Sequence, residues 1–124
     1  MNREQAKYLH PQVVANIAQS EADGGIYTED IKDGETIIFH TSNTKYTLRK
    51  AEDGTGDFFI QGNMKYCPTP VRCRVNGSTW DGSMIKVGWI GIDMRLEVYP
   101  VGGSDTMPRG ITTSYIKSIE RKQK

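Results

Sequence analysis

Residues 36–50 read Thr-Ile-Ile-Phe-His-Thr-Ser-Asn-Thr-Lys-Tyr-Thr-Leu-Arg-Lys, and this stretch decides the fold class. Its first part is rich in β-branched and aromatic residues, which is typical of a strand, and Ser42-Asn43 then marks a tight polar turn. After the turn, Tyr46 and Leu48 alternate with polar and basic residues, so one face of a second strand points to a core and the other to solvent. The stretch therefore predicts an antiparallel β-hairpin.

The rest of the chain shows the same bias toward strands. It holds 12 isoleucines, seven valines and 11 threonines against only three leucines, and β-branched side chains pack well on a pleated sheet but lose rotamer freedom in helices. Gly88 and Gly91 interrupt a long apolar stretch, where they predict bulges or sharp bends. The predicted strands span residues 36–41, 44–50, 58–61, 71–75, 84–99 and 111–119. We therefore expect a mainly β fold, a small antiparallel β-barrel or sandwich of about six strands, with one short N-terminal helix.

A short amphipathic segment precedes the strands. Pro11 suits the first turn of a helix, apolar residues follow at helical spacing, and Gly24-Gly25 provides a stop, so we expect a helix over about 11–22. Residues 1–34 carry three basic and six acidic side chains, whereas the remainder carries 13 basic and nine acidic ones. The predicted organisation is a leader over 1–34 that holds the helix and an acidic connector, a β-domain over 35–119 and a charged tail over 120–124.

Length and composition exclude several classes of protein. A chain of 124 residues forms one domain, and it holds no apolar stretch near the roughly 20 residues of a membrane helix. Its first 30 residues lack the apolar region of a signal peptide, so we expect a cytoplasmic, single-domain protein without membrane contact. The surplus of four basic side chains after residue 34 is too small to indicate a nucleic-acid partner by itself.

The cysteines and histidines indicate no metal chemistry. Two cysteines cannot form a disulfide framework, although a single Cys67–Cys73 bridge is conceivable. Cys73 shares a strand face with Val71 and Val75, which predicts a small buried core residue. Histidine occurs only twice, without zinc-finger spacing, and the carboxylates are scattered singly, so the sequence predicts no metal site and no cofactor.

The candidate binding residues lie in one loop and on the strands beside it. Residues 77–83 read Gly-Ser-Thr-Trp-Asp-Gly-Ser and have the Gly-x4-Gly spacing of a phosphate loop, but not its lysine. The hydroxyls are also explained as turn residues that bond their own backbone. Two arginines share the outer face of the preceding strand, and a lysine alternates with apolar neighbours beyond the loop. The predicted ligand-binding residues are Arg72, Arg74, Ser78, Thr79, Trp80, Ser83 and Lys86.

These residues favour a binding module over an enzyme. Cations that follow phosphates and aromatic rings that stack on bases are combined in single-strand nucleic-acid binders, so single-stranded nucleic acid or another anionic ligand is the expected partner. An ordinary solvated face, with the tryptophan packed over the core, is the alternative. A second hypothesis is an assembly subunit that contacts a protein partner or forms a homo-oligomer through the helix at 11–22 or an unpaired strand edge. A third is a hydrolase-type enzyme that uses Ser78, Ser83 or Cys67 with His40.

Three stretches also carry a resemblance when they are taken together: 34–48, 76–86 and 111–119. They resemble a family of short bacterial and phage proteins of uncharacterised function, in which a Gly-Ser-Thr-Trp-Gly-Gly-Ser-type loop sits between strands. The loop is the most specific part, and Asp81 stands where the family pattern has glycine. The resemblance covers roughly 34–119 and implies a small soluble protein, but no activity, ligand or catalytic residue.

Overall fold

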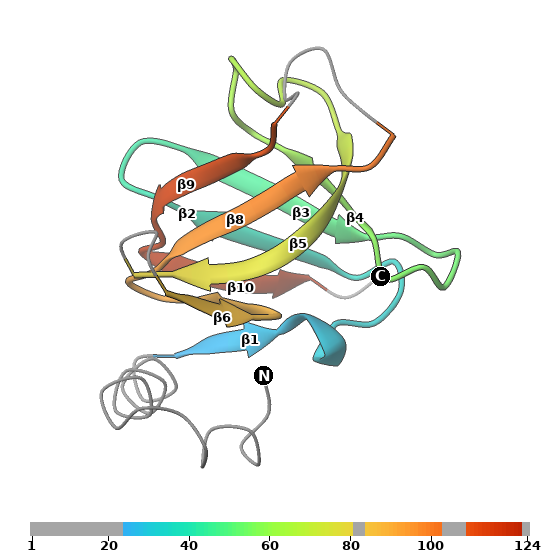
Figure 1. Ribbon diagram of the computed structural model, residues 1–124, viewed down its shortest axis with the longest axis horizontal. Coiled ribbons are helices and arrows are strands. Elements are labelled where there is room, and N and C mark those ends of the chain that lie inside the picture. Colours follow the sequence, from blue (N-terminus) through green and yellow to red (C-terminus); the bar gives the residue numbers. More distant parts are fainter. Residues whose placement is uncertain (1–23, 81–83, 103–108, 123–124) are drawn as a thin grey trace.

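The computed structural model describes residues 24–80, 84–102 and 109–122, and strands are its main elements (Figure 1). The described strands, in chain order, are β1 (Gly25–Tyr27), β2 (Thr36–His40), β3 (Lys45–Lys50), β4 (Phe58–Gln61), β5 (Val71–Thr79), β6 (Ile85–Val87), β7 (Trp89–Gly91), β8 (Arg95–Pro100), β9 (Ile111–Tyr115) and β10 (Ser118–Lys122). A single 3-10 turn, η1 (Thr28–Asp30), follows β1. Among the described residues, no helix has the length and apolar character needed to cross a membrane. The pairs between these strands are antiparallel, so the predicted mainly β, antiparallel fold is confirmed.

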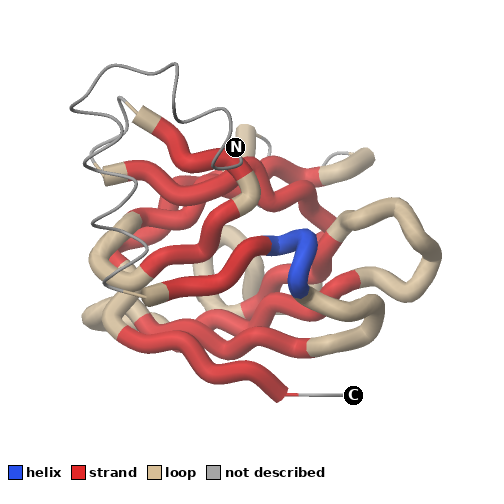
Figure 2. Tube along the Cα trace, turned by 90° about the horizontal axis from the view of Figure 1, so that it is seen from below, coloured by secondary structure: helices blue, strands red, loops and turns tan. Residues whose placement is uncertain are grey.

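One large sheet contains eight of the strands. Its order is β10-β2-β3-β4-β5-β8-β9, with β6 beside β5, and β1 pairs with β7 in a second, two-stranded sheet. Figure 2 views the molecule from below, with the strand that leads into η1 in front. The large sheet is not closed, because β9 and β10 are the two ends of the strand order. The structure therefore does not confirm the predicted barrel, and the predicted helix at 11–22 lies outside the described residues.

The hairpin predicted from residues 36–50 is present. β2 and β3 pair in register from Thr36 opposite Arg49 to His40 opposite Lys45. The inward residues of these strands and of β4, β5 and β8 form the core. Tyr46, Leu48 and Cys73 are buried in it as predicted, whereas Val71 and Val75 are partly buried and pack against it. Buried core side chains include Ile37, Phe39, Tyr46, Leu48, Phe58, Ile60, Cys67, Cys73, Ile90, Met94, Leu96, Val98 and Ile116.

Two of the predicted strands are divided in the structure. The stretch 84–99 forms β6, β7 and β8, with breaks at Gly88, where φ is +69°, and near Asp93, where φ is +63°. The stretch 111–119 forms β9, which pairs with β8, and the start of β10, which pairs with β2. The strand is divided because its pairing partner changes. Pairing also extends beyond 35–119, since β1 pairs with β7 and β10 runs on to Lys122.

The largest difference from the sequence prediction lies in β5. The Asn76-Gly77 pair favours a tight turn, yet β5 continues through it to Thr79. A register shift between Val75 and Gly77 marks a bulge, after which the strand lies between β6 on one side and β8 on the other. Residues 76–79 are therefore part of a central strand rather than the start of a loop.

An ion pair between the buried Glu35 and the exposed Arg121 holds the start of β2 against β10. Glu35 is 2% exposed, and its carboxylate accepts from Arg121 Nε at 2.6 Å and Arg121 Nη2 at 2.8 Å. The Lys32 amide donates to the same carboxylate at 2.9 Å. These hydrogen bonds, above all those from Arg121, lower the pKa of Glu35 to about 2. Glu35 therefore joins the segment after η1 to the last described strand.

Candidate functional site

The structure does not bring the predicted ligand-binding residues together on one surface. Ser78 and Thr79 are 0% and 1% exposed, because they occupy the part of β5 that lies between β6 and β8. The Ser78 hydroxyl donates to the Trp89 carbonyl oxygen at 2.5 Å and accepts from the Gly91 amide at 3.2 Å. Both partners belong to β7, so Ser78 fixes β7 to β5 and is closed to a surface ligand.

Lys86 is also buried, so it does not share a basic face with the β5 arginines. Its Nζ lies 3.9 Å from the centroid of the Trp89 ring and 5.3 Å from that of Tyr27, and these two rings meet edge to face at 4.7 Å. A cation held over aromatic rings away from water is stabilised by about 2 kcal/mol. Because Tyr27 lies in β1 and Trp89 in β7, Lys86 ties the small sheet to the large one. Alternation predicts which residues share a strand face, but not which face is covered.

Trp80 and Ser83 complete the predicted binding loop. Trp80 directly follows β5 and is half-buried, and its carbonyl oxygen accepts from the Tyr115 hydroxyl at 2.9 Å. Ser83 lies outside the described residues. Residues 77–79 belong to strand β5, so the described part of the Gly-x4-Gly stretch is not a loop that could surround a phosphate.

Arg72 lies on the outer face of β5, as predicted, but its guanidinium already has partners. Nη2 contacts Asp53 Oδ2 at 2.6 Å and Thr55 Oγ1 at 3.0 Å, and Nε donates to Asp57 Oδ2 at 3.0 Å. Hydrogen bonds from Thr55 and Arg72 lower the pKa of Asp53 to about 2, while both carboxylates raise the pKa of Arg72. Arg72 therefore anchors the loop between β3 and β4 and contributes little unpaired positive charge.

The outer face of the sheet instead centres on Phe59 of β4. Arg49 and Arg72 are its direct partners in the β3 and β5 ladders, and their guanidinium carbons lie 4.8 Å and 5.6 Å from the centroid of its ring. The ring is only half-buried between them. In the part of the chain that the structure describes, no carboxylate forms an ion pair with Arg49. A partly exposed aromatic ring thus lies against two guanidinium groups on the outer sheet face, and the Arg49 group has no carboxylate partner among the described residues.

A shallow pocket of about 110 Å³ adjoins this ring. Its lining residues are Thr36, Thr47, Arg49, Phe59, Gln61 and Pro70. Hydroxyl, amide and guanidinium groups surround the aromatic ring, so the pocket offers hydrogen-bond donors and acceptors to a flat ligand. The sequence prediction did not include Phe59 or Arg49. Alternation with the buried Phe58 and Ile60 could have placed Phe59 on the outside, whereas its contact with Arg49 depends on the register of β3 and β4.

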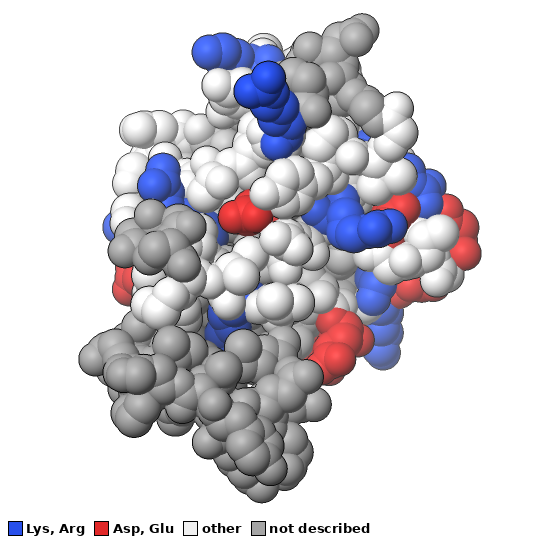
Figure 3. All heavy atoms as spheres, in the orientation of Figure 1, with Lys and Arg blue, Asp and Glu red and all other residues white. Residues whose placement is uncertain are grey.

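Arg74 lies two residues further along β5 and is largely exposed. Its side chain is 73% exposed, and its guanidinium lies 3.6 Å from Asp57 Oδ1. Across the ladder it faces Tyr99 of β8, which is 45% exposed. Figure 3 shows basic side chains spread over the visible face of the molecule with acidic ones among them. The surface therefore offers individual cations beside aromatic rings rather than one large basic patch.

Among the described residues of the enzyme hypothesis, which leave out Ser83, none is paired with another. His40 Nδ1 lies 3.3 Å from the hydroxyl of Ser118, its neighbour in β10, while Ser78 bonds to β7. Cys67 and Cys73 are buried free thiols, and burial raises both pKa values, that of Cys73 to about 12. The prediction of Cys73 as a core residue is confirmed. Among the described residues, no group of three or more His, Cys, Asp or Glu side chains is placed to hold a metal ion.

Comparisons of the chain with models of protein families, with curated proteins and with solved structures find no match. Function is therefore inferred from the outer face itself.

Proposed function

We propose that this protein is a non-enzymatic binding module for single-stranded nucleic acid, with its contact surface on the outer face of β3, β4 and β5. The observation that supports the proposal is the half-buried Phe59 ring between Arg49, at 4.8 Å, and Arg72, at 5.6 Å. Stacking of bases on aromatic rings, with cations placed to meet phosphates, is how such proteins bind without base pairing. This surface replaces the 77–83 loop as the proposed contact.

A single strand fits this face better than a duplex. Stacking on Phe59 needs a base whose plane is open, and the bases of a duplex are already stacked on one another. The pocket beside the ring has polar groups from Thr36, Thr47 and Gln61, which can meet the edge of an unpaired base. The ion pairs of Arg72 with Asp53 and Asp57 hold its guanidinium against the Phe59 ring and neutralise its charge.

The unneutralised or weakly paired cations on this surface set the expected salt dependence. Arg49 and Arg74 provide two phosphate contacts, and each contact to a single strand changes the slope of log K against log salt by about 0.7. Two contacts give a slope of about −1.4, so affinity should fall about sevenfold between roughly 50 mM and 200 mM salt. Weak, salt-sensitive binding is the expected behaviour.

The test is a fluorescence-anisotropy titration of a labelled single-stranded dT 12-mer at these two salt concentrations. Arg49→Ala should weaken binding and reduce the salt effect to about threefold, because one phosphate contact is lost. Lys117→Ala is the matched control, since Lys117 is an exposed cation whose amide donates to the His40 carbonyl oxygen, at the other end of β2 from the Thr36 that lines the Phe59 pocket. Absence of binding at the lower salt concentration, or equal loss in both variants, would contradict the proposal.

A second candidate function is assembly through a strand edge. β9 has the sequence Ile-Thr-Thr-Ser-Tyr, without a charged residue, and pairs only with β8 in the described sheet, whereas the opposite end strand β10 carries Glu120, Arg121 and Lys122. Charged residues protect sheet edges from pairing with other chains, so β9 is the less protected edge. Light scattering after size-exclusion chromatography tests this candidate: a strictly monomeric protein at about 1 mg/ml would remove self-association.

A further inference from the structure

β5 carries two arginine–aromatic pairs, one on each side. Arg72 faces Phe59 of β4, and Arg74, two residues later, faces Tyr99 of β8. Two strand spacings and a two-residue step along the strand separate the Cα atoms of Phe59 and Tyr99 by about 12 Å. The 45% exposed ring of Tyr99 is therefore a second aromatic platform on the same outer surface, further along the sheet from the Phe59 ring.

The surroundings of Tyr99 differ from those of Phe59 because they include a carboxylate. Glu97 Oε1 accepts from the Tyr99 hydroxyl at 2.8 Å and from Asn76 Nδ2 at 3.0 Å. No hydrogen bond joins the second oxygen, Oε2, to another described residue. Two fixed donors on one oxygen hold the carboxylate in place and leave the other oxygen to accept from a ligand.

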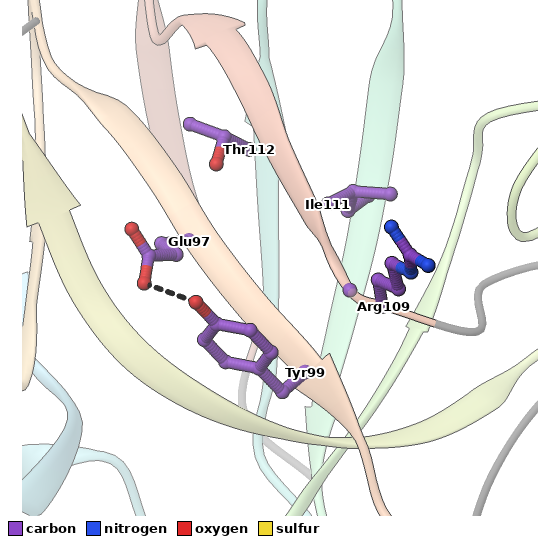
Figure 4. Close-up of a pocket in the computed structure, with 6 residues that line it drawn as sticks. Glu97, Tyr99, Arg109, Ile111 and Thr112 are labelled. Carbon is purple, nitrogen blue, oxygen red and sulfur yellow. Dashed lines mark hydrogen bonds between the residues drawn. The ribbon is translucent and has the colours of Figure 1, made fainter. Parts of the chain in front are cut away.

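A small pocket of about 70 Å³ opens at this carboxylate (Figure 4). Glu97, Tyr99 and Thr112 lie together on one side of β9, whereas Arg109 and Ile111 lie on the other side of that strand in the view. The side that holds Glu97 therefore presents an acceptor and an aromatic ring, with a threonine hydroxyl nearby. The Glu97 carboxylate can accept from an amino group at a base edge, and the Arg109 guanidinium, which also lines the pocket, can donate to a carbonyl oxygen of the same base.

We propose that the Tyr99–Glu97 pocket is a base-reading subsite of the same interface and selects cytosine over thymine. Cytosine presents an N4 amino group with two donors, whereas the one donor of thymine, N3–H, lies between two carbonyl oxygens that a carboxylate repels. This inference rests on the proposed function, because the strand must already lie across β5.

The test compares labelled dC and dT 12-mers in the anisotropy assay with the wild-type protein and Glu97→Gln. One charge-assisted hydrogen bond gives an expected preference of about tenfold for dC in the wild type. Glu97→Gln should abolish that preference and leave dT binding unchanged or tighter, because the amide also donates to O4. A variant that merely failed to fold would instead lose dT binding.

Tyr99→Phe is the matched control, since it keeps the ring and removes only one of the two donors to Glu97. It should keep a preference for dC. Equal affinity of the wild type for dC and dT, or an unchanged preference in Glu97→Gln, would overturn the inference while leaving the proposed function intact. Failure of both oligonucleotides to bind would contradict the proposed function as well.

Discussion

Replacing Gly77 by alanine tests whether residues 76–79 belong to the central strand β5 rather than to a surface loop. Gly77 has φ +150° and lies in β5 opposite Val87 of β6 and Glu97 of β8. An alanine Cβ would lie 2.3 Å from the Lys86 carbonyl oxygen and 3.0 Å from the Val87 Cα, so the backbone of β6 would have to move. If residues 76–79 were a surface loop, no such obstruction would exist.

The cost has two parts that can be separated by experiment. Left-handed backbone costs a non-glycine residue about 1–2 kcal/mol, and displacement of the β5–β6 ladder costs about 1 kcal/mol for each hydrogen bond weakened. A total of about 3 kcal/mol corresponds to a fall in melting temperature of roughly 10 °C for a domain of this size. Gly56→Ala is the control, because Gly56 has φ +80° but nothing within 4 Å of the added Cβ.

The assay is thermal and urea unfolding of the wild type and both variants, followed by circular dichroism. Gly77→Ala should be less stable than Gly56→Ala by about 2 kcal/mol, which is the part due to the contact with Lys86. Equal stabilities of the two variants would refute the placement of Gly77 in a central strand. A larger loss in Gly56→Ala would refute it as well.

Three further predictions concern the ion pairs and the thiols. Because its pKa is lowered from 4.5 to about 2, Glu35 stabilises the fold above its ordinary pKa and loses that contribution as pH falls from about 4.5 to 2. Glu35→Gln should therefore cost about 2 kcal/mol at neutral pH in urea unfolding, and the difference from the wild type should shrink below pH 4.5. Arg72→Ala should lower the free energy of unfolding by about 2 kcal/mol, because it leaves the buried Asp57 without its main partner. Arg74→Ala should change the free energy of unfolding by less than about 1 kcal/mol and should weaken oligonucleotide binding. A larger loss of stability in Arg74→Ala than in Arg72→Ala would be inconsistent with these contacts. Cys67 and Cys73 should react with an aromatic disulfide reagent only as fast as the protein unfolds, since burial raises both pKa values; rapid reaction of the native thiols would contradict their burial.

Much of the fold follows from local patterns in the sequence. The strands at 36–41, 44–50 and 58–61 were predicted to within about one residue, because alternation and turn residues act over a few positions and agree with the packing there. The Asn76-Gly77 pair carried a turn signal that tertiary context overrode, since pairing with β6 and β8 on both sides favours a bulged strand.

The candidate site was less predictable, because its contacts join distant parts of the chain. Arg72 meets Asp53, 19 residues away, and that pairing removes the free charge expected of it. The contact between Arg49 and Phe59 depends on the register of two strands, which the sequence does not specify. Lys86 was predicted as a surface cation because lysine is mostly exposed in proteins. It is instead buried against the rings of Tyr27 and Trp89, which come from other strands.

The binding of a single-stranded 12-mer by Phe59→Thr and Phe59→Trp tests the central claim most directly. The threonine suits a strand and removes the aromatic plane, so affinity should fall about tenfold, whereas the tryptophan keeps the plane and should retain binding. Unchanged melting temperatures, within about 3 °C, would show that both variants keep the fold. If Phe59→Thr bound the 12-mer as tightly as the wild type, the outer face of β3, β4 and β5 would not be a nucleic-acid interface.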